Sequence, residues 1–343
     1  MDAAALASPN LYPLIFDIAR DAVRMVVLDE TRYRAASFLD GRLLAQAEPG
    51  EWIARASLEQ AAAGLDGECD FIFHIGHVGS TLLSRLLDIS DRVFSLREPA
   101  ILRTLAMAAM DGADPRSVEQ WTGMFLKLWS RVYRPGQRAL LKATSFTAEI
   151  APLLMRLTPS ASAILMFVSP GVHLATIFGG EASREELMIN APMRLARLHR
   201  RLGQHVWRLK DLSEGEIAAM SWACEVTALA AAARAFPDRI LWIDFEALLK
   251  APSDGLAASL KRLHGVAPEA DIRAMFASPD LNRYSKAPEH AYSASLRYQV
   301  LAQAHAEHRV EIDRGIAWLN AAGTRHAILA NAIREVAAAI RSG

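Results

Sequence analysis

The chain has 343 residues, of which 52% are apolar and 22% are charged, so it can bury a sizeable core and is not mainly disordered. Lysine plus arginine total 38 and aspartate plus glutamate total 38, which gives a formal net charge of zero. Proteins that coat nucleic acid or anionic membranes normally carry a basic excess. We therefore expect no nucleic-acid partner, and any anionic ligand must be met by a local site.

The predicted elements alternate between short strands and longer helices after an N-terminal lead-in, residues 1–69, with one strand (Val23–Leu28) and one helix (Glu30–Leu44). In residues 70–250 this alternation predicts a mostly parallel sheet with helices on both faces. The predicted strands are Asp70–Ile75, Arg92–Leu96, Ala139–Lys142, Ser162–Val168 and Arg239–Phe245, and the helices include Leu82–Ile89, Ser117–Tyr133, Phe146–Leu157 and Glu216–Phe236.

The C-terminal part, residues 251–343, is predicted to be mainly helical apart from a turn-rich segment at Pro279–Ser295. The whole chain, 1–343, is interpreted as a single α/β domain. The weakly charged stretch Ile217–Ala233 carries Glu225 near its middle and is too short and too polar for a membrane span. We interpret it as a buried or half-buried helix, and we expect a cytoplasmic protein without a secretory signal or an integral membrane segment.

The loop after the first strand of the predicted sheet carries the strongest functional signal. It reads His74-Ile-Gly-His-Val-Gly-Ser-Thr-Leu-Leu, a strand end, a glycine-punctuated turn and the start of a helix. Gly76 and Gly79 allow a positive φ, while Ser80 and Thr81 add hydroxyls to the amides that open the helix. Such a loop suits a phosphate or phosphosulfate, but it lacks the lysine of a Walker A motif. The alternative is a tight turn with a serine N-cap.

The string Gly79-Ser80-Thr81-Leu82-Leu83 behind an apolar strand resembles the 5′-phosphosulfate loop of the sulfotransferase superfamily, and the longer string from His74 resembles a bacterial branch of it. The resemblance implies a P-loop-type three-layer αβα fold with a mostly parallel central sheet and extra C-terminal helices. It also implies 3′-phosphoadenosine 5′-phosphosulfate (PAPS) as co-substrate, 3′,5′-adenosine bisphosphate (PAP) as product and no metal. The implied donor-binding residues of this loop are Gly76, His77, Val78, Gly79, Ser80, Thr81 and Leu82.

The second strand of the sheet ends at Glu98-Pro99, and Pro99 cannot continue a ladder, so Glu98 lies at the carboxyl edge of the sheet. By resemblance to glycan and tyrosyl-protein sulfotransferases, Glu98 is the catalytic base that accepts the proton of the acceptor hydroxyl. The alternative is a structural carboxylate that pairs with Arg97, Arg103 or another cation at the start of the next helix.

Two further residues are candidates for charge stabilisation near the phosphosulfate. Lys142 ends a strand and is a candidate ligand, although a lysine that merely extends from a strand end toward solvent is an equal alternative. His77 holds the position where the family loop usually carries lysine or arginine. It is a candidate hydrogen-bond donor to the leaving bridging oxygen, the alternative being an ordinary turn residue.

The site for the 3′-phosphate is the weakest part of the resemblance. Ser169 stands where the family usually has an arginine, and Thr176 lies near the place of a family serine. Both hydroxyls remain candidate ligands. The segment around Arg283 and Lys286 resembles the basic loop that closes over the nucleotide, so Lys286 is the preferred substitute cation, with Arg283 second.

The segment Arg194–Lys210 contains no acid and is predicted to be a helix with a solvated basic face, the alternatives being capture of an acceptor or an anionic membrane surface. Neither its histidines nor His305 and His308 have the spacing of a metal site, so we expect no metal. Cys69 and Cys224 are the only cysteines, which excludes a disulfide framework.

Together these features predict a sulfotransferase that moves a sulfuryl group from PAPS to a hydroxyl or amine of a small-molecule, glycan or lipid acceptor. One alternative is a nucleotide-dependent kinase on the same fold, which the missing Walker lysine and the lack of a clear Mg²⁺ ligand other than Asp244 oppose. The other is a non-catalytic nucleotide-binding protein, which His77 and Ser169 support as departures from the basic family pattern.

Overall fold

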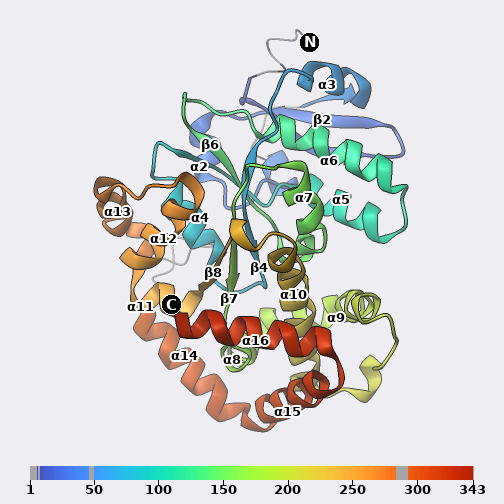
Figure 1. Ribbon diagram of the computed structural model, residues 1–343, viewed down its shortest axis with the longest axis vertical. Helices are drawn as coiled ribbons and strands as arrows, with labels where there is room; N and C mark the ends of the chain where they lie inside the picture. The colour runs from blue at the N-terminus through green and yellow to red at the C-terminus, as the bar shows by residue number, and fades with distance from the viewer. Residues whose placement is uncertain (1–5, 7, 46–49, 283–292, 343) are drawn as a thin grey trace.

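A five-stranded parallel sheet forms the centre of the molecule in a computed structural model that describes residues 6, 8–45, 50–282 and 293–342 (Figure 1). The strand order is β5 (Val93–Arg97), β6 (Arg138–Lys142), β4 (Cys69–His74), β7 (Ala163–Phe167) and β8 (Ile240–Asp244). Every residue of β4, β5 and β7 is buried. Burial on both faces explains why these strands read as continuous apolar runs, and the predicted parallel sheet is confirmed.

Helices cover both faces of this sheet. Helices α4 (Ser80–Leu87) and α12 (Pro252–His264) contact the sheet and each other, while α7 (Ala151–Leu157) and α10 (Glu214–Ala235) lie on its other side (Figure 1). The remaining helices of the middle part of the chain are α5 (Ala100–Met110), α6 (Pro115–Trp129), α8 (Pro170–Phe178), α9 (Glu181–Leu202) and α11 (Phe245–Lys250). The C-terminal part adds α13 (Glu269–Phe276), α14 (Ala294–Glu307), α15 (Arg309–Arg325) and α16 (Ala327–Ser342).

The N-terminal part differs from the prediction of one strand and one long helix. It forms a three-stranded antiparallel sheet of β1 (Leu11–Asp17), β2 (Ala22–Val27) and β3 (Glu51–Ala54), with the helices α2 (Glu30–Ala35) and α3 (Arg55–Ala62). The pattern of β1 is broken at Pro13, where the register with β2 shifts, and β3 is short and mostly exposed. Both strands therefore lack a clear alternation in the sequence.

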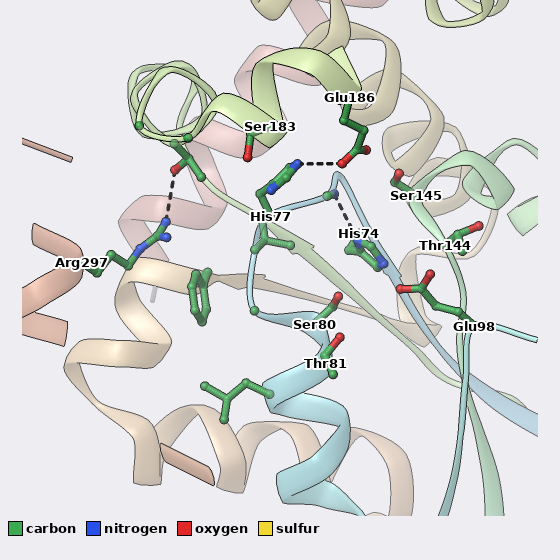
Figure 2. A pocket seen from close by; sticks show the side chains of 18 of the residues that line it. His74, His77, Ser80, Thr81, Glu98, Thr144, Ser145, Ser183, Glu186 and Arg297 are labelled. Carbon is green, nitrogen blue, oxygen red and sulfur yellow. Dashed lines mark hydrogen bonds and ion pairs between the residues drawn. The ribbon is translucent and has the colours of Figure 1, made fainter. Parts of the chain in front are cut away.

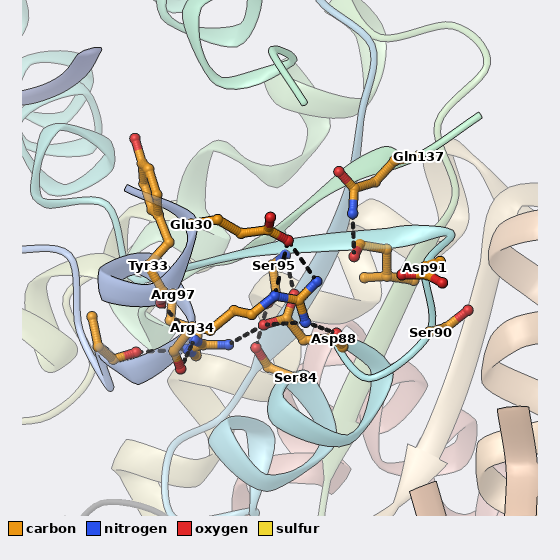
Figure 3. Close-up of polar contacts among 12 residues, drawn as sticks. Glu30, Tyr33, Arg34, Ser84, Asp88, Ser90, Asp91, Ser95, Arg97 and Gln137 are labelled. Carbon is orange, nitrogen blue, oxygen red and sulfur yellow. Dashed lines mark hydrogen bonds and ion pairs between the residues drawn. The ribbon is translucent and has the colours of Figure 1, made fainter. Parts of the chain in front are cut away.

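Helix α2 ends at Ala35, well before the predicted end at Leu44. It ends there because the buried side chain of Arg97, from the central sheet, donates hydrogen bonds to the carbonyl groups at the end of the helix (Figure 3). Arg97 of β5 donates to the carbonyl oxygens of Tyr33, Arg34 and Ala36, each at 2.7 Å. A longer helix would need these carbonyls for its own ladder. The guanidinium thus ends the helix and fixes the N-terminal part to β5.

Helix α10 contains the stretch that we predicted to be buried. Among the described residues it is the one helix long and apolar enough to span a membrane, yet 89% of its apolar window is buried inside the fold. Trp222 lies at its centre, 1% exposed, and its indole N–H donates to the carbonyl of Val168 at 3.0 Å. These contacts are those of a core helix.

The predicted basic helix Arg194–Lys210 is wrong in its extent and in its environment. Helix α9 ends at Leu202, where Gly203 adopts a φ of +70°. Arg197 is 1% exposed and pairs with Glu225 of α10 and Glu149, so this face is buried rather than solvated. The acidic partners come from other elements, which the local sequence pattern cannot reveal.

Candidate active site

The loop between β4 and α4 is a tight turn that contains two glycines with positive φ values. Gly76 and Gly79 have φ values of +88° and +63°, and His77 between them has a φ of +55°. A Cβ atom on Gly79 would overlap the ring of Phe245, so both the backbone conformation and the packing require glycine. The Nδ1 atom of His74 accepts the N–H of Gly76 at 3.0 Å and thereby braces the start of the turn.

A cavity of about 420 Å³ lies over this loop (Figure 2). Its size falls in the range of small-molecule and cofactor sites. Besides the loop, it is lined by described residues of α4, α5, α8, α9, α11 and α14 and of the segments that follow β5 and β6. Of the residues singled out from the sequence, those that line it are Gly76, His77, Val78, Gly79, Ser80, Thr81, Leu82, Glu98 and Thr176. The cavity therefore joins the loop to the candidate base.

Glu98 lies at the cavity wall with Lys142 directly behind it. The Glu98 carboxylate contacts the ammonium of Lys142, whose side chain has no exposed surface. The Glu98 backbone has a φ of +53°, and its N–H donates to the Lys142 carbonyl at 2.7 Å. Lys142 was predicted as a ligand of the phosphosulfate, but it is not among the described residues that line the cavity, and its ammonium contacts Glu98 instead.

Of the two hydroxyl residues predicted to bind the 3′-phosphate, Thr176 and Ser169, only Thr176 is among the described residues that line the cavity. Thr176 lines the cavity, and its hydroxyl donates to the carbonyl of Val172 at 2.7 Å. Ser169 caps α8 by accepting the N–H of Val172 at 3.4 Å and is not among the described lining residues. The predicted substitute cations, Arg283 and Lys286, fall outside the described residues.

Arg297 and Arg103 line the cavity, although neither is among the residues predicted to bind the 3′-phosphate. Arg297 of α14 reaches Glu246 at 2.7 Å and the Thr176 hydroxyl at 3.5 Å, and its guanidinium lies 5.0 Å from the centre of the Phe245 ring. Arg103 of α5 is exposed at the same cavity. The only sequence signal for Arg297 is that it follows the basic segment already suspected of closing over a nucleotide.

A carboxylate from α9 faces the loop. The Oε2 atom of Glu186 lies 3.5 Å from Nε2 of His77, and both side chains line the cavity (Figure 2). Behind His77, on α8, His173 is buried. Burial, and next the nearby charges of His77 and Arg194, lower the pKa of the His173 imidazole to about 3. His173 is therefore neutral at physiological pH.

No group of three or more His, Cys, Asp or Glu side chains able to hold a metal ion occurs in the part of the chain that the structure describes. Among the described lining residues, the charged side chains are Glu98, Arg103, Glu186 and Arg297, with His74 and His77 as titratable neighbours. This set suits an anion that is held by amides, hydroxyls and guanidinium groups.

No family model matches the sequence, and no curated protein matches it. Among solved structures, it is similar to a sulfotransferase domain from the curacin biosynthetic pathway, at 13% identity and a TM-score of 0.40 over 70% of this chain and 96% of the other. Sulfotransferase STF9 from Mycobacterium avium gives 13% identity and 0.39 over 74% and 80%. A sulfotransferase from Alicyclobacillus acidocaldarius gives 15% and 0.37 over 73% and 98%.

Proposed function

We propose that this protein is a sulfotransferase that transfers a sulfuryl group from PAPS to a hydroxyl or amine acceptor. The observation that carries the proposal is that the glycine loop and Glu98 line one cavity of about 420 Å³. A phosphate cradle and a carboxylate base within one such cavity are the two parts that sulfuryl transfer needs. We propose a small molecule, a glycan or a lipid as the acceptor.

In this proposal the loop holds the phosphosulfate of the donor. The amides of residues 78–81 and the hydroxyls of Ser80 and Thr81 lie at the N-terminus of α4, where the helix dipole favours negative charge. The acceptor oxygen forms a bond to sulfur while the bond between sulfur and the bridging oxygen breaks. The acceptor proton passes to Glu98, and the electron pair of the broken bond stays on the 5′-phosphate of PAP. His77 and the loop amides stabilise that charge.

Lys142 supports the base instead of binding the donor. Its buried ammonium offsets the charge of the Glu98 carboxylate and fixes its position, which is the preorganisation that a general base requires. The positive φ of Glu98 is held by the hydrogen bond to the Lys142 carbonyl. Both contacts come from Lys142 at the end of the neighbouring strand β6, so the pairing of β5 with β6 positions the Glu98 carboxylate.

Arg297 is our candidate for the cation that Ser169 does not supply. Its guanidinium reaches Thr176, which lines the same cavity, and its side chain is only 10% exposed. The planar fork of N–H donors on a guanidinium matches the oxygens of a phosphate, and the Thr176 hydroxyl adds a further polar group beside it. Glu246 pairs with Arg297, so a 3′-phosphate would exchange one anionic partner of this guanidinium for another.

The kinase alternative has less support from the site. Asp244 is the acid that it would use for Mg²⁺, but its carboxylate caps α11 by accepting the N–H of Glu246 at 3.3 Å, and it is not among the described lining residues. Incubation with radiolabelled PAPS or with ATP and Mg²⁺ over a panel of phenols, sugars and amines separates the two reactions. Sulfate transfer that Glu98→Gln abolishes supports the proposal, whereas phosphate transfer alone contradicts it.

A further inference from the structure

The contact between His77 and Glu186 is not explained by the loop motif or by the base. The Nε2 atom of His77 lies 3.5 Å from the Glu186 carboxylate, and the His77 side chain is 19% exposed (Figure 2). His77 stands in the loop itself, at a φ of +55° between two glycines that both line the cavity. Helix α9 thus places the carboxylate of Glu186 beside His77, which is the one titratable residue between those two glycines.

Glu186 is itself held by a buried arginine. Its side chain is 50% exposed, and an exposed ion pair by itself contributes little. Its other oxygen, however, lies 3.6 Å from Arg194, which is 9% exposed, and Arg194 lies 3.5 Å from the buried Glu225. Arg197 then pairs with both oxygens of Glu225 at 2.7 and 3.0 Å. Glu186 is therefore the outer end of a chain of ion pairs that leads into the core.

In this series of ion pairs, the number of cations equals the number of carboxylates without counting His77. The cations are Arg194, Arg197 and Arg201, and the carboxylates are Glu149, Glu186 and Glu225. Removing one member of such a buried set is costly, because its partners are left buried and uncompensated. The set thereby fixes α9 against α10 and holds Glu186 over the loop.

The other titratable and charged groups around His77 do not compete for this role. His173 of α8 has a pKa lowered to about 3 by burial and adds no charge at neutral pH, and Arg194 faces Glu186 and Glu225. Within the loop, His74 accepts the N–H of Gly76. Across the cavity, the charged groups are Glu98, which contacts Lys142, Arg297, which pairs with Glu246, and the exposed Arg103.

We propose that Glu186 is a positioning residue that holds His77 in its doubly protonated form when the donor or PAP is bound. This inference rests on the proposed function. Because Nε2 of His77 is the ring nitrogen that lies 3.5 Å from the Glu186 carboxylate, Nδ1 is the nitrogen left to reach the oxygen that bridges sulfur and the 5′-phosphate. An imidazole ring that donates from both nitrogens carries a positive charge. The loop thus acquires, on ligand binding, the cation that a lysine would supply permanently.

Proton uptake on binding tests this role without requiring an acceptor. PAP is titrated calorimetrically at pH 8, where its phosphates are already ionised, in buffers of different ionisation enthalpy. The wild type takes up a large fraction of one proton per PAP. Glu186→Gln takes up little and binds PAP about tenfold more weakly or worse, because the carboxylate beside the His77 imidazole is lost. Glu185→Gln, the same change one residue earlier on α9, behaves like the wild type.

A second variant separates positioning from folding. His77→Lys carries a permanent charge, so it binds PAP without proton uptake, and adding Glu186→Gln to it changes PAP affinity less than twofold. If Glu186→Gln retains the proton uptake of the wild type, or if the wild type binds PAP without uptake, the role of Glu186 is overturned while the proposed function stands. Failure of the wild type to bind PAP contradicts both.

Discussion

Lys142 is fully buried beneath Glu98, and the two side chains form an ion pair at the edge of the cavity. They are also joined through the backbone, because the N–H of Glu98 donates to the carbonyl of Lys142 at 2.7 Å. A φ of +53° at a glutamate costs about 1 kcal/mol, which the neighbouring strand must offset. The pair is therefore a single unit in which the lysine sets the position of the carboxylate.

Removing the lysine alone is expected to damage the fold. Lys142→Met leaves Glu98 without its buried cation, and we expect a loss of about 3 kcal/mol in the free energy of unfolding by urea. Adding Glu98→Gln recovers part of that loss, because the uncompensated charge is gone. Lys250→Met, at an exposed position of α11, is the control. If Lys142→Met is as stable as Lys250→Met, the pair does not have the role assigned to it.

The glycine loop tolerates no side chain at Gly79. Gly79→Ala places a Cβ into the ring of Phe245 at a φ of +63°, so we expect lost PAP binding and a loss of about 2 kcal/mol or more in stability. Gly203→Ala is the matched control, because Gly203 has a φ of +70° and open space around it. The difference between the two variants isolates the effect of the clash. Equal stability and full PAP affinity in Gly79→Ala contradict this account of the loop.

Arg297 is expected to recognise the 3′-phosphate specifically. Arg297→Met removes the guanidinium beside Thr176, so the dissociation constant for PAP rises about tenfold or more, while that for adenosine 5′-phosphate changes little. Arg309→Met, an exposed arginine of α15, should change neither constant. Calorimetry with both nucleotides measures the effect. Equal weakening for both nucleotides would assign Arg297 to the fold or to the 5′ end instead.

His173 makes stability depend on pH. Its pKa is about 3 in the folded protein and about 6.5 when exposed, so below about pH 6.5 the unfolded chain binds the extra proton. Stability therefore falls as pH is lowered from about 6.5 toward 3, by at most about 5 kcal/mol from this residue.

His173→Leu removes that titration, so its melting temperature should fall less between pH 7 and pH 4.5 than that of the wild type. Burial raises the pKa of Asp70 to about 6, which gives a slope of opposite sign above about pH 3.8, but this contribution cancels in the comparison of the two proteins. His305→Leu, at an exposed position, controls for the loss of an imidazole. Parallel pH curves for His173→Leu and the wild type would contradict the assignment.

The features that could be predicted from the sequence are those whose pattern lies within a short stretch of consecutive residues. The buried strands, the glycine loop and the carboxylate before Pro99 each have a local pattern, and the structure places them together. The pairing of Glu98 with Lys142 was not predicted, because it depends on the register of β5 against β6.

Arg297 and Glu186 were missed for a similar reason. Each sits on a helix with no motif around it and reaches the cavity only through tertiary packing. The local sequence predicts that the arginines of α9 are solvated, because it contains no acidic partner for them. Their partners, Glu149 and Glu225, come from other elements. Patterns of charge in one segment do not show whether the compensating charge is supplied elsewhere in the fold.

Calorimetry with PAP on the wild type and on Glu98→Gln, followed by an assay of sulfate transfer from PAPS, tests whether Glu98 serves a PAPS-type site. We expect tight binding of PAP by both proteins and sulfate transfer by the wild type alone, because Glu98 accepts the acceptor proton and the loop holds the nucleotide. Absence of PAP binding by the wild type at high micromolar concentrations would contradict it.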